Sequence, residues 1–215
     1  MRLILVCLFM AWSVTAFTQH EMGEDGGTFP DYQPIGREEI PSTEKAYNFG
    51  GVYATQWAFY YVSQEEIIRT EGSLENWLLN PLSPRFDKDS FEYNIFKHAF
   101  VGNYYYLFFR SRNYTEKDSF ISSFLASLAF EFTVETITEK PSYQDIYQTP
   151  VFGTVLGIGS EKLSNYLHAQ GKWYWDTLGY IVNPMTLIPQ FARKKIAAVP
   201  IIEKNKVGAV VTFGF

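Results

Sequence analysis

The stretch RFDKDSFEYNIFKHAFVGNYYYLFFRSRN, residues 85–113, decides the fold class of this chain. Asp and Ser at 87–90 are helix-capping residue types, so we expect a helix that begins near Ser90 or Asn94 and runs to about Ser111. The stretch is apolar almost all round, which is typical of a buried helix. Residues at every fourth position share one face, and that face consists of His98, Gly102, Tyr106 and Arg110.

A second long helix is expected to begin at Asp118 or Ser119 and to end near Glu139, because Lys140 precedes a proline. Steps of four residues along it define a slowly drifting seam of small and polar groups: Ser119, Ser123, Ser127, Glu131 and Glu135. Small side chains let a neighbouring helix approach closely. We therefore expect this seam to dock on the helix face that carries His98.

The two glutamates of the seam need partners, because an ionised carboxylate in an apolar setting must be paired, hydrogen-bonded or protonated. Candidate partners are His98, Arg110, Arg112 and tyrosine hydroxyls of the preceding helix. The favoured interpretation is a network that pins the two helices together. The alternative is an active site, with its candidate catalytic groups His98, Glu131, Glu135 and Asp145.

A metal site is a weaker hypothesis, and its candidate ligands are Asp87, Asp89, His98 and Glu135. One histidine with several carboxylates suits a hard or borderline divalent cation. However, the sequence has neither a His-x-x-x-His nor a Glu-x-x-His spacing, and it has no Gly-x-Ser-x-Gly elbow for a serine nucleophile. No other cofactor is expected.

The N-terminus has the features of a secretory signal peptide. Arg2 precedes an apolar stretch, residues 3–12, and small residues follow up to Ala16, after which we expect cleavage. Cys7 lies in this segment, so the mature chain would have no cysteine. Residues 17–46, with Gly and Pro and no apolar period, are expected to form a flexible leader.

The remainder is predicted to be mainly α, with a compact helical domain of about five helices over residues 47–195 and a C-terminal β-hairpin over 196–215. Residues 51–70 favour a helix, although their first half could be a strand. Further expectations are a short amphipathic piece at 74–79, a loop and short packed segment after Pro141, and helices at 160–170 and 172–182. The hairpin alternates in hydropathy and ends on Phe215, so it could pack on the helices or touch a membrane.

Aromatic residues make up 18% of the chain, with 19 Phe, 15 Tyr and 5 Trp. Such a surplus fits either a core built from rings or contact with lipid, because Tyr and Trp suit boundaries between dry and wet surroundings. The formal net charge of −5 becomes −6 when Arg2 leaves with the signal peptide. This acidity gives no reason to expect a nucleic-acid partner.

Residues 86–114 and 130–157 resemble the exported Gram-negative family catalogued as domain of unknown function 3943. The matching positions are Asp87, Asp89, Asn94, His98, Gly102, Tyr104, Tyr105, Glu131, Glu135, Pro141, Ser142, Asp145, Thr149, Pro150 and Gly153. Two positions depart from the pattern, since Ala99 replaces a proline and Ile158 stands where an acid is expected. The resemblance implies an exported protein but no reaction.

These features together predict a periplasmic protein associated with the outer membrane. Its expected role is that of a structural or interaction component whose partner is membrane lipid or an outer-membrane protein. The alternatives are a lipid- or envelope-modifying enzyme that uses the His/Glu/Asp cluster, and a lipid-binding module with an apolar cavity between the long helices. An enzyme requires an open site, whereas a structural network should be closed and paired.

Overall fold

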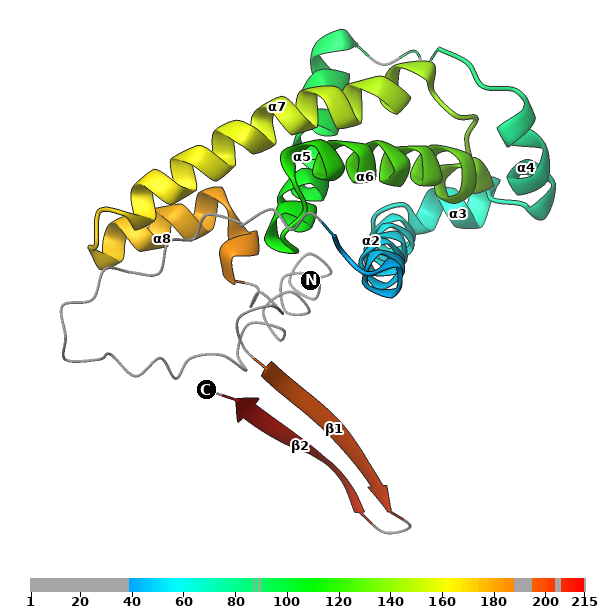
Figure 1. The fold of residues 1–215 in the computed structure, drawn as a ribbon. Helices are drawn as coiled ribbons and strands as arrows, with labels where there is room; N and C mark the ends of the chain where they lie inside the picture. The colour runs from blue at the N-terminus through cyan, green and yellow to red at the C-terminus, as the bar shows by residue number, and fades with distance from the viewer. Residues whose placement is uncertain (1–38, 87, 89, 188–194, 204–205, 215) are drawn as a thin grey trace.

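The structure is a computed structural model that describes residues 39–86, 88, 90–187, 195–203 and 206–214 (Figure 1). The predicted signal peptide, most of the predicted leader, and Asp87 and Asp89 lie outside the described residues. The mainly α class is confirmed. The expected number of about five helices is wrong, because the described residues form seven α-helices, α2 to α8.

The first three helices are α2 (Ser42–Ser63), α3 (Glu65–Glu71) and α4 (Leu74–Leu79), and a 3₁₀ turn, Asn80–Leu82, follows them. Residues 51–63 are therefore helical, and α2 begins before Tyr47, where we expected structure to start. Ser73 caps α4 by accepting a hydrogen bond from Asn76 N, which fits the amphipathic piece predicted at 74–79.

The long helices are α5 (Phe91–Ser111), α6 (Glu116–Ala129) and α7 (Tyr143–His168). Thr115 caps α6, and Ser142 caps α7. In Figure 1, α7 is the longest rod, and it lies beside α5 and α6. The last helix, α8 (Trp173–Val182), packs on the C-terminal part of α7 and precedes a 3₁₀ turn, Pro184–Leu187.

The region after Pro141 differs from the prediction. We expected a loop, a short packed segment and a helix from Ser160, but α7 is one continuous helix with Pro150 inside it. Proline and glycine disfavour helix interiors. Here Pro150 and Gly153 are buried against α5, so the packing of the two helices outweighs the local preference.

The α5 and α7 helices are parallel and in register. His98 faces Thr149, Gly102 meets Gly153, Tyr106 meets Gly157 and Arg110 pairs with Glu161. Each pair advances by four residues on both helices, so ridges of one helix fit grooves of the other. The predicted face of α5 is thus a docking face, but its partner is α7 rather than α6.

The end of α6 also departs from the prediction of one helix to Glu139. After Ala129 the chain forms a π-helical turn, Phe130–Val134, and then a 3₁₀ turn, Glu135–Ile137. This irregular end receives hydrogen bonds from the α4 region. Trp77 Nε1 donates to Thr133 O (2.6 Å), Asn80 Nδ2 donates to Thr136 O (3.0 Å), and Ser73 N donates to Ile137 O (3.1 Å).

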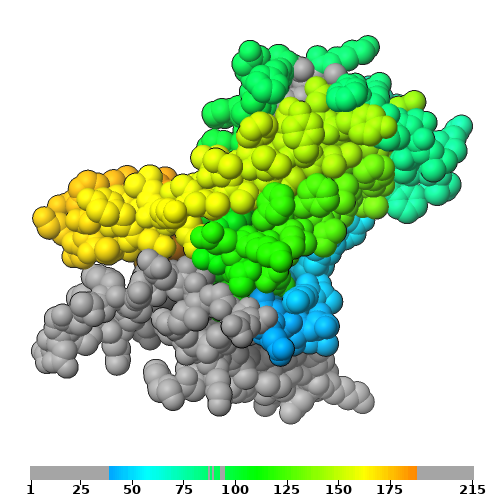
Figure 2. Space-filling view, turned by 45° about the horizontal axis from the view of Figure 1, so that its top comes forward, coloured from blue at the N-terminus to red at the C-terminus, as the bar shows by residue number. Residues whose placement is uncertain are grey.

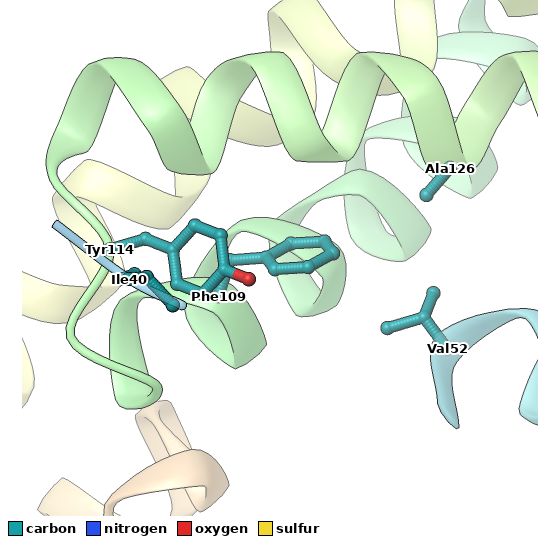
Figure 3. Close-up of a cluster of buried hydrophobic side chains, with 5 residues drawn as sticks. All are labelled: Ile40, Val52, Phe109, Tyr114 and Ala126. Atoms are coloured by element: carbon teal, nitrogen blue, oxygen red, sulfur yellow. The ribbon is translucent and has the colours of Figure 1, made fainter. Parts of the chain in front are cut away.

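A small apolar core joins α2 to the turn between α5 and α6 (Figure 3). It consists of Ile40, Val52, Phe109, Tyr114 and Ala126. The rings of Phe109 and Tyr114 lie 5.2 Å apart between centroids. This cluster fixes α2 on the α5–α6 pair.

The C-terminal strands β1 (Lys195–Glu203) and β2 (Lys206–Gly214) pair antiparallel in Figure 1, with Lys195 opposite Gly214 and Glu203 opposite Lys206. The role of this segment as a packed hairpin of the domain stays a prediction.

Candidate functional site: a buried polar junction of α5, α6 and α7

His98 links α5 to the first turns of α7. Its Nε2 lies 3.1 Å from Asp145 Oδ1, and its Nδ1 lies 3.1 Å from Thr149 Oγ1. The imidazole therefore lies between a carboxylate and a hydroxyl on two successive turns of one helix. We expected His98 to lie against the glutamates of α6, and these contacts on α7 correct that expectation.

Glu131 links the π turn after α6 to the start of α7. Its Oε2 accepts a hydrogen bond from Ser142 N at 2.9 Å, and its side chain is only 1% exposed. Ser142 Oγ in turn accepts from Asp145 N at 3.3 Å, and Ser127 Oγ donates to Asp145 O at 3.3 Å. Glu131, a member of the polar seam, thus contacts Ser142, the residue that caps α7. Ser142 in turn contacts Asp145, which is the partner of His98.

Glu131 and Glu135 lie close enough to influence each other's protonation. Burial raises the pKa of Glu131 well above its usual range, and repulsion from Glu135 raises it further. Burial also raises the pKa of Glu135 to about 7, with repulsion from Glu139 and Asp145 adding to this effect and Lys97 opposing it. A carboxyl whose pKa is about 7 still carries its proton at the lower end of the neutral pH range. In that protonated form it is uncharged, which explains how these acids tolerate an apolar setting.

Tyrosines from two other helices line the glutamate pair. Tyr60 of α2 hydrogen-bonds with Thr138, and Tyr105 of α5 accepts from Gln56 Nε2 at 2.9 Å. Burial raises the pKa of both phenols, and the negative charge of Glu131 and Glu135 contributes to this rise. Both tyrosines therefore stay neutral and act as hydrogen-bonding groups.

A second buried ionic link lies farther along the α5–α7 interface. Arg110 makes a bidentate contact with Glu161, with Nε 2.9 Å from Oε2 and Nη2 2.7 Å from Oε1. Arg110 Nη1 also donates to Tyr114 O at 2.6 Å. The prediction that Arg110 satisfies Glu131 or Glu135 is therefore corrected. The signal for Glu161 was present, because it continues a series of every fourth residue: Asp145, Thr149, Gly153, Gly157 and Glu161.

The four candidate catalytic residues fall into two adjoining groups. His98 and Asp145 form one, Glu131 and Glu135 form the other, and Ser142 connects them. His98, Asp145, Ser142 and Glu131 are all buried, whereas Glu135 is partly exposed. This arrangement can hold or move protons within the protein, but its buried side chains are closed to a large substrate.

The metal hypothesis gains no support from the described part of the chain. Within it, no group of three or more His, Cys, Asp or Glu side chains is placed to hold a metal ion. Asp87 and Asp89, two of the four candidate ligands, fall outside that part. His98 has its ring nitrogens beside Asp145 and Thr149 instead.

One family model matches the segment of the chain that contains this junction. The model for a domain of unknown function, DUF3943, matches residues 83–185. Over these residues the chain is similar to the DUF3943 family. No curated protein and no solved structure gives a significant match.

The DUF3943 segment spans α5 to α8 and includes every helix of the polar junction. Several of the motif residues behind the sequence resemblance meet there in three dimensions. They supply the imidazole and its partners, the buried Glu131 and its donor Ser142, and the glycine contact between α5 and α7. In this chain, these residues hold the helices of the matched segment together.

Proposed function

We propose that this protein is an exported structural or interaction component of the cell envelope, whose helical body contacts the lipid of the outer membrane. Its polar junction holds the helices together, and its apolar exterior faces the membrane. One observation carries the proposal, namely that the middle parts of α2, α5 and α7 expose large apolar side chains, while charged side chains there are absent or buried.

The apolar exterior extends over every long helix. In α5, Phe96 is 71% exposed and its ring stacks toward Phe100, and in α7, Val155 is 68% exposed. Exposed large apolar residues occur also on α2, α6 and α8, among them Phe59, Tyr61, Ile121, Leu125 and Ile181. Monomeric soluble proteins rarely carry large apolar patches on their surface. A single protein partner would cover one patch, whereas lipid can cover several helices at once.

Charged residues are absent or buried in the middle parts of α2, α5 and α7. Residues 46–64 contain no Asp, Glu, Lys or Arg, and neither do residues 146–160. Residues 98–115 contain two arginines, both buried. Ionisable groups that face inward and pair with one another are typical of helices in contact with lipid.

We propose that the helices contact the membrane surface without crossing the membrane. One helical stretch of the described residues, Glu116–Ile137, is long and apolar enough to cross a membrane, with a third of its most apolar window buried. The buried helix of a water-soluble core passes the same test. Because this stretch carries Glu131 in the interior and packs against α2, α5 and α7, it is better explained as the central helix of the body.

An enzymatic role has less support. General acid–base or nucleophilic groups must reach a substrate. His98, Thr149 and Asp145 lie together but are buried between α5 and α7, where they join two helices. The geometry favours a structural role for these groups.

Flotation of the full-length chain tests the proposed function. The protein is produced with its own leader in a Gram-negative host, and lysate is floated through a density gradient with and without high salt. We expect the chain to rise with outer-membrane markers under both conditions and to leave them only on addition of detergent. Recovery as a monodisperse soluble protein without detergent would refute the proposal.

A further inference from the structure

The α8 helix is attached to α7 by its polar inner face. Ser164 Oγ donates to Gly179 O at 2.9 Å, and His168 Nδ1 lies 3.0 Å from Asp176 Oδ1. A Cβ added to Gly179 would lie 2.7 Å from His168 Nε2, so the imidazole requires glycine at this position. These contacts fix which side of α8 faces outward.

The outer face of α8 is apolar and aromatic. Trp173 is 79% exposed, and Tyr174, Leu178 and Ile181 are also exposed. With 100° per residue, these four positions span about 140° of the helix. In Figure 1 the helix lies at one end of the body, beside the C-terminal half of α7.

Exposed lysines occur at the start of α8 and on α7, the helix that adjoins it. The nearby acids are engaged, because Asp176 pairs with His168 and Glu161 pairs with Arg110. Lys162 and Lys172 are exposed, and Lys172 Nζ lies 5.9 Å from the centre of the Tyr174 ring. Exposed lysines on a chain with a net charge of −5 complement a negatively charged surface.

We propose that α8 binds at the boundary between headgroups and acyl chains of an anionic phospholipid surface. Trp173, Leu178 and Ile181 enter the acyl region, while Lys162 and Lys172 contact lipid phosphates. Trp and Tyr with flanking lysines are typical of helices that lie in this boundary. A face of one 10-residue helix is smaller than the roughly 1,000 Å² that a specific protein interface requires, whereas a lipid surface sets no such minimum.

This inference rests on the proposed function, because it names the part of the body that meets the membrane and the lipid chemistry that it recognises. The test uses the chain from Phe17 onward, without the predicted signal peptide, so that no cysteine of its own remains. An environment-sensitive fluorophore is attached to Trp173→Cys or Ile181→Cys, and to Glu66→Cys on α3 as the matched exposed control. Each protein is mixed with vesicles of phosphatidylcholine, with or without phosphatidylglycerol, that carry brominated acyl chains.

We expect blue-shifted emission and bromine quenching at positions 173 and 181, and neither at position 66. Replacing both lysines, with Lys162→Gln and Lys172→Gln, should weaken binding to vesicles that contain phosphatidylglycerol by about tenfold and leave binding to phosphatidylcholine unchanged. If the chain binds the vesicles while positions 173 and 181 stay unquenched, the inference about α8 is wrong and membrane association stands. If these positions are shielded only in native membranes, a protein covers α8 instead of lipid. A chain that binds no membrane refutes both proposals.

Discussion

Gly102 of α5 and Gly153 of α7 meet backbone to backbone, and a Cβ built on either glycine would overlap the other helix. This contact lies between two polar links of the same interface, His98 to Thr149 on one side and Arg110 to Glu161 on the other. The close approach of the backbones lets these short side-chain contacts form.

The glycine contact predicts that Gly153→Ala destabilises the body by about 2 kcal/mol, because the added methyl group meets backbone atoms that cannot move aside. Thermal unfolding in mild detergent measures the effect. Gly159→Ala is the matched control, since a Cβ there meets no atom within 4 Å. That control should be neutral or stabilising by up to about 1 kcal/mol. Equal effects of the two substitutions would show that α5 and α7 do not pack as described.

The buried ionic pair predicts that Arg110→Ala costs about 3–5 kcal/mol, because it leaves Glu161 buried without its cation. Replacing both residues by apolar ones, with Arg110→Met and Glu161→Leu, should recover most of this loss. Chemical unfolding of the single and double variants measures the difference. A double variant no more stable than Arg110→Ala would argue against direct pairing.

The His98 contact predicts an energetic coupling between α5 and α7. In a double-mutant cycle of His98→Ala and Asp145→Ala, we expect a coupling of about 1 kcal/mol or more, since the two side chains lie 3.1 Å apart and are both buried. The same cycle of His98→Ala with Glu66→Ala should show additivity. Unchanged thermal stability of His98→Ala together with a lost cellular phenotype would point to a catalytic role instead.

Much of the helical body could be predicted from the sequence. The predicted bounds of α5 and α8 lie within a few residues of the observed ones, and the face of α5 that carries His98 and Arg110 follows from spacing alone. The seam of α6 was also correctly placed in the interior, since Ser119, Ser123, Ser127 and Glu131 are buried. These features depend on local periodicity, which a single sequence contains.

The partner of each face could not be predicted in this way. Pro150 and the glycines at 153 and 157 suggest a loop locally, and only the docking of α5 makes them part of a helix. Because α6 follows α5 in the chain, it was the natural partner for His98. The three-dimensional order, with α7 parallel to α5, brings Asp145 and Glu161 to that face instead.

The glutamate pair predicts that stability falls as pH rises. The pKa of Glu135 is about 7 in the folded protein and about 4.5 when unperturbed, so the folded state binds its proton more tightly than the unfolded state does. This contribution to stability is fully present below pH 4.5 and is lost as pH rises through 7. Melting temperatures between pH 5 and pH 8 should therefore decline, and Glu135→Gln should reduce the decline.

The exposed Glu66 provides the control for this titration. Glu66→Gln should leave the pH dependence of the melting temperature unchanged. Identical pH profiles for the wild type, Glu135→Gln and Glu66→Gln would mean that the glutamate pair holds no proton that matters for folding.

The central claim is that the outward side chains of the long helices contact lipid while their polar side chains join the helices. The most direct measurement is bromine quenching of a fluorophore on Val155→Cys, in the middle of the outer face of α7. The chain from Phe17 onward is used, with vesicles that carry brominated acyl chains. The account predicts strong quenching at Val155 and none at a fluorophore on Glu66→Cys. An unquenched, water-exposed Val155 in a chain that stays out of the vesicles would contradict it.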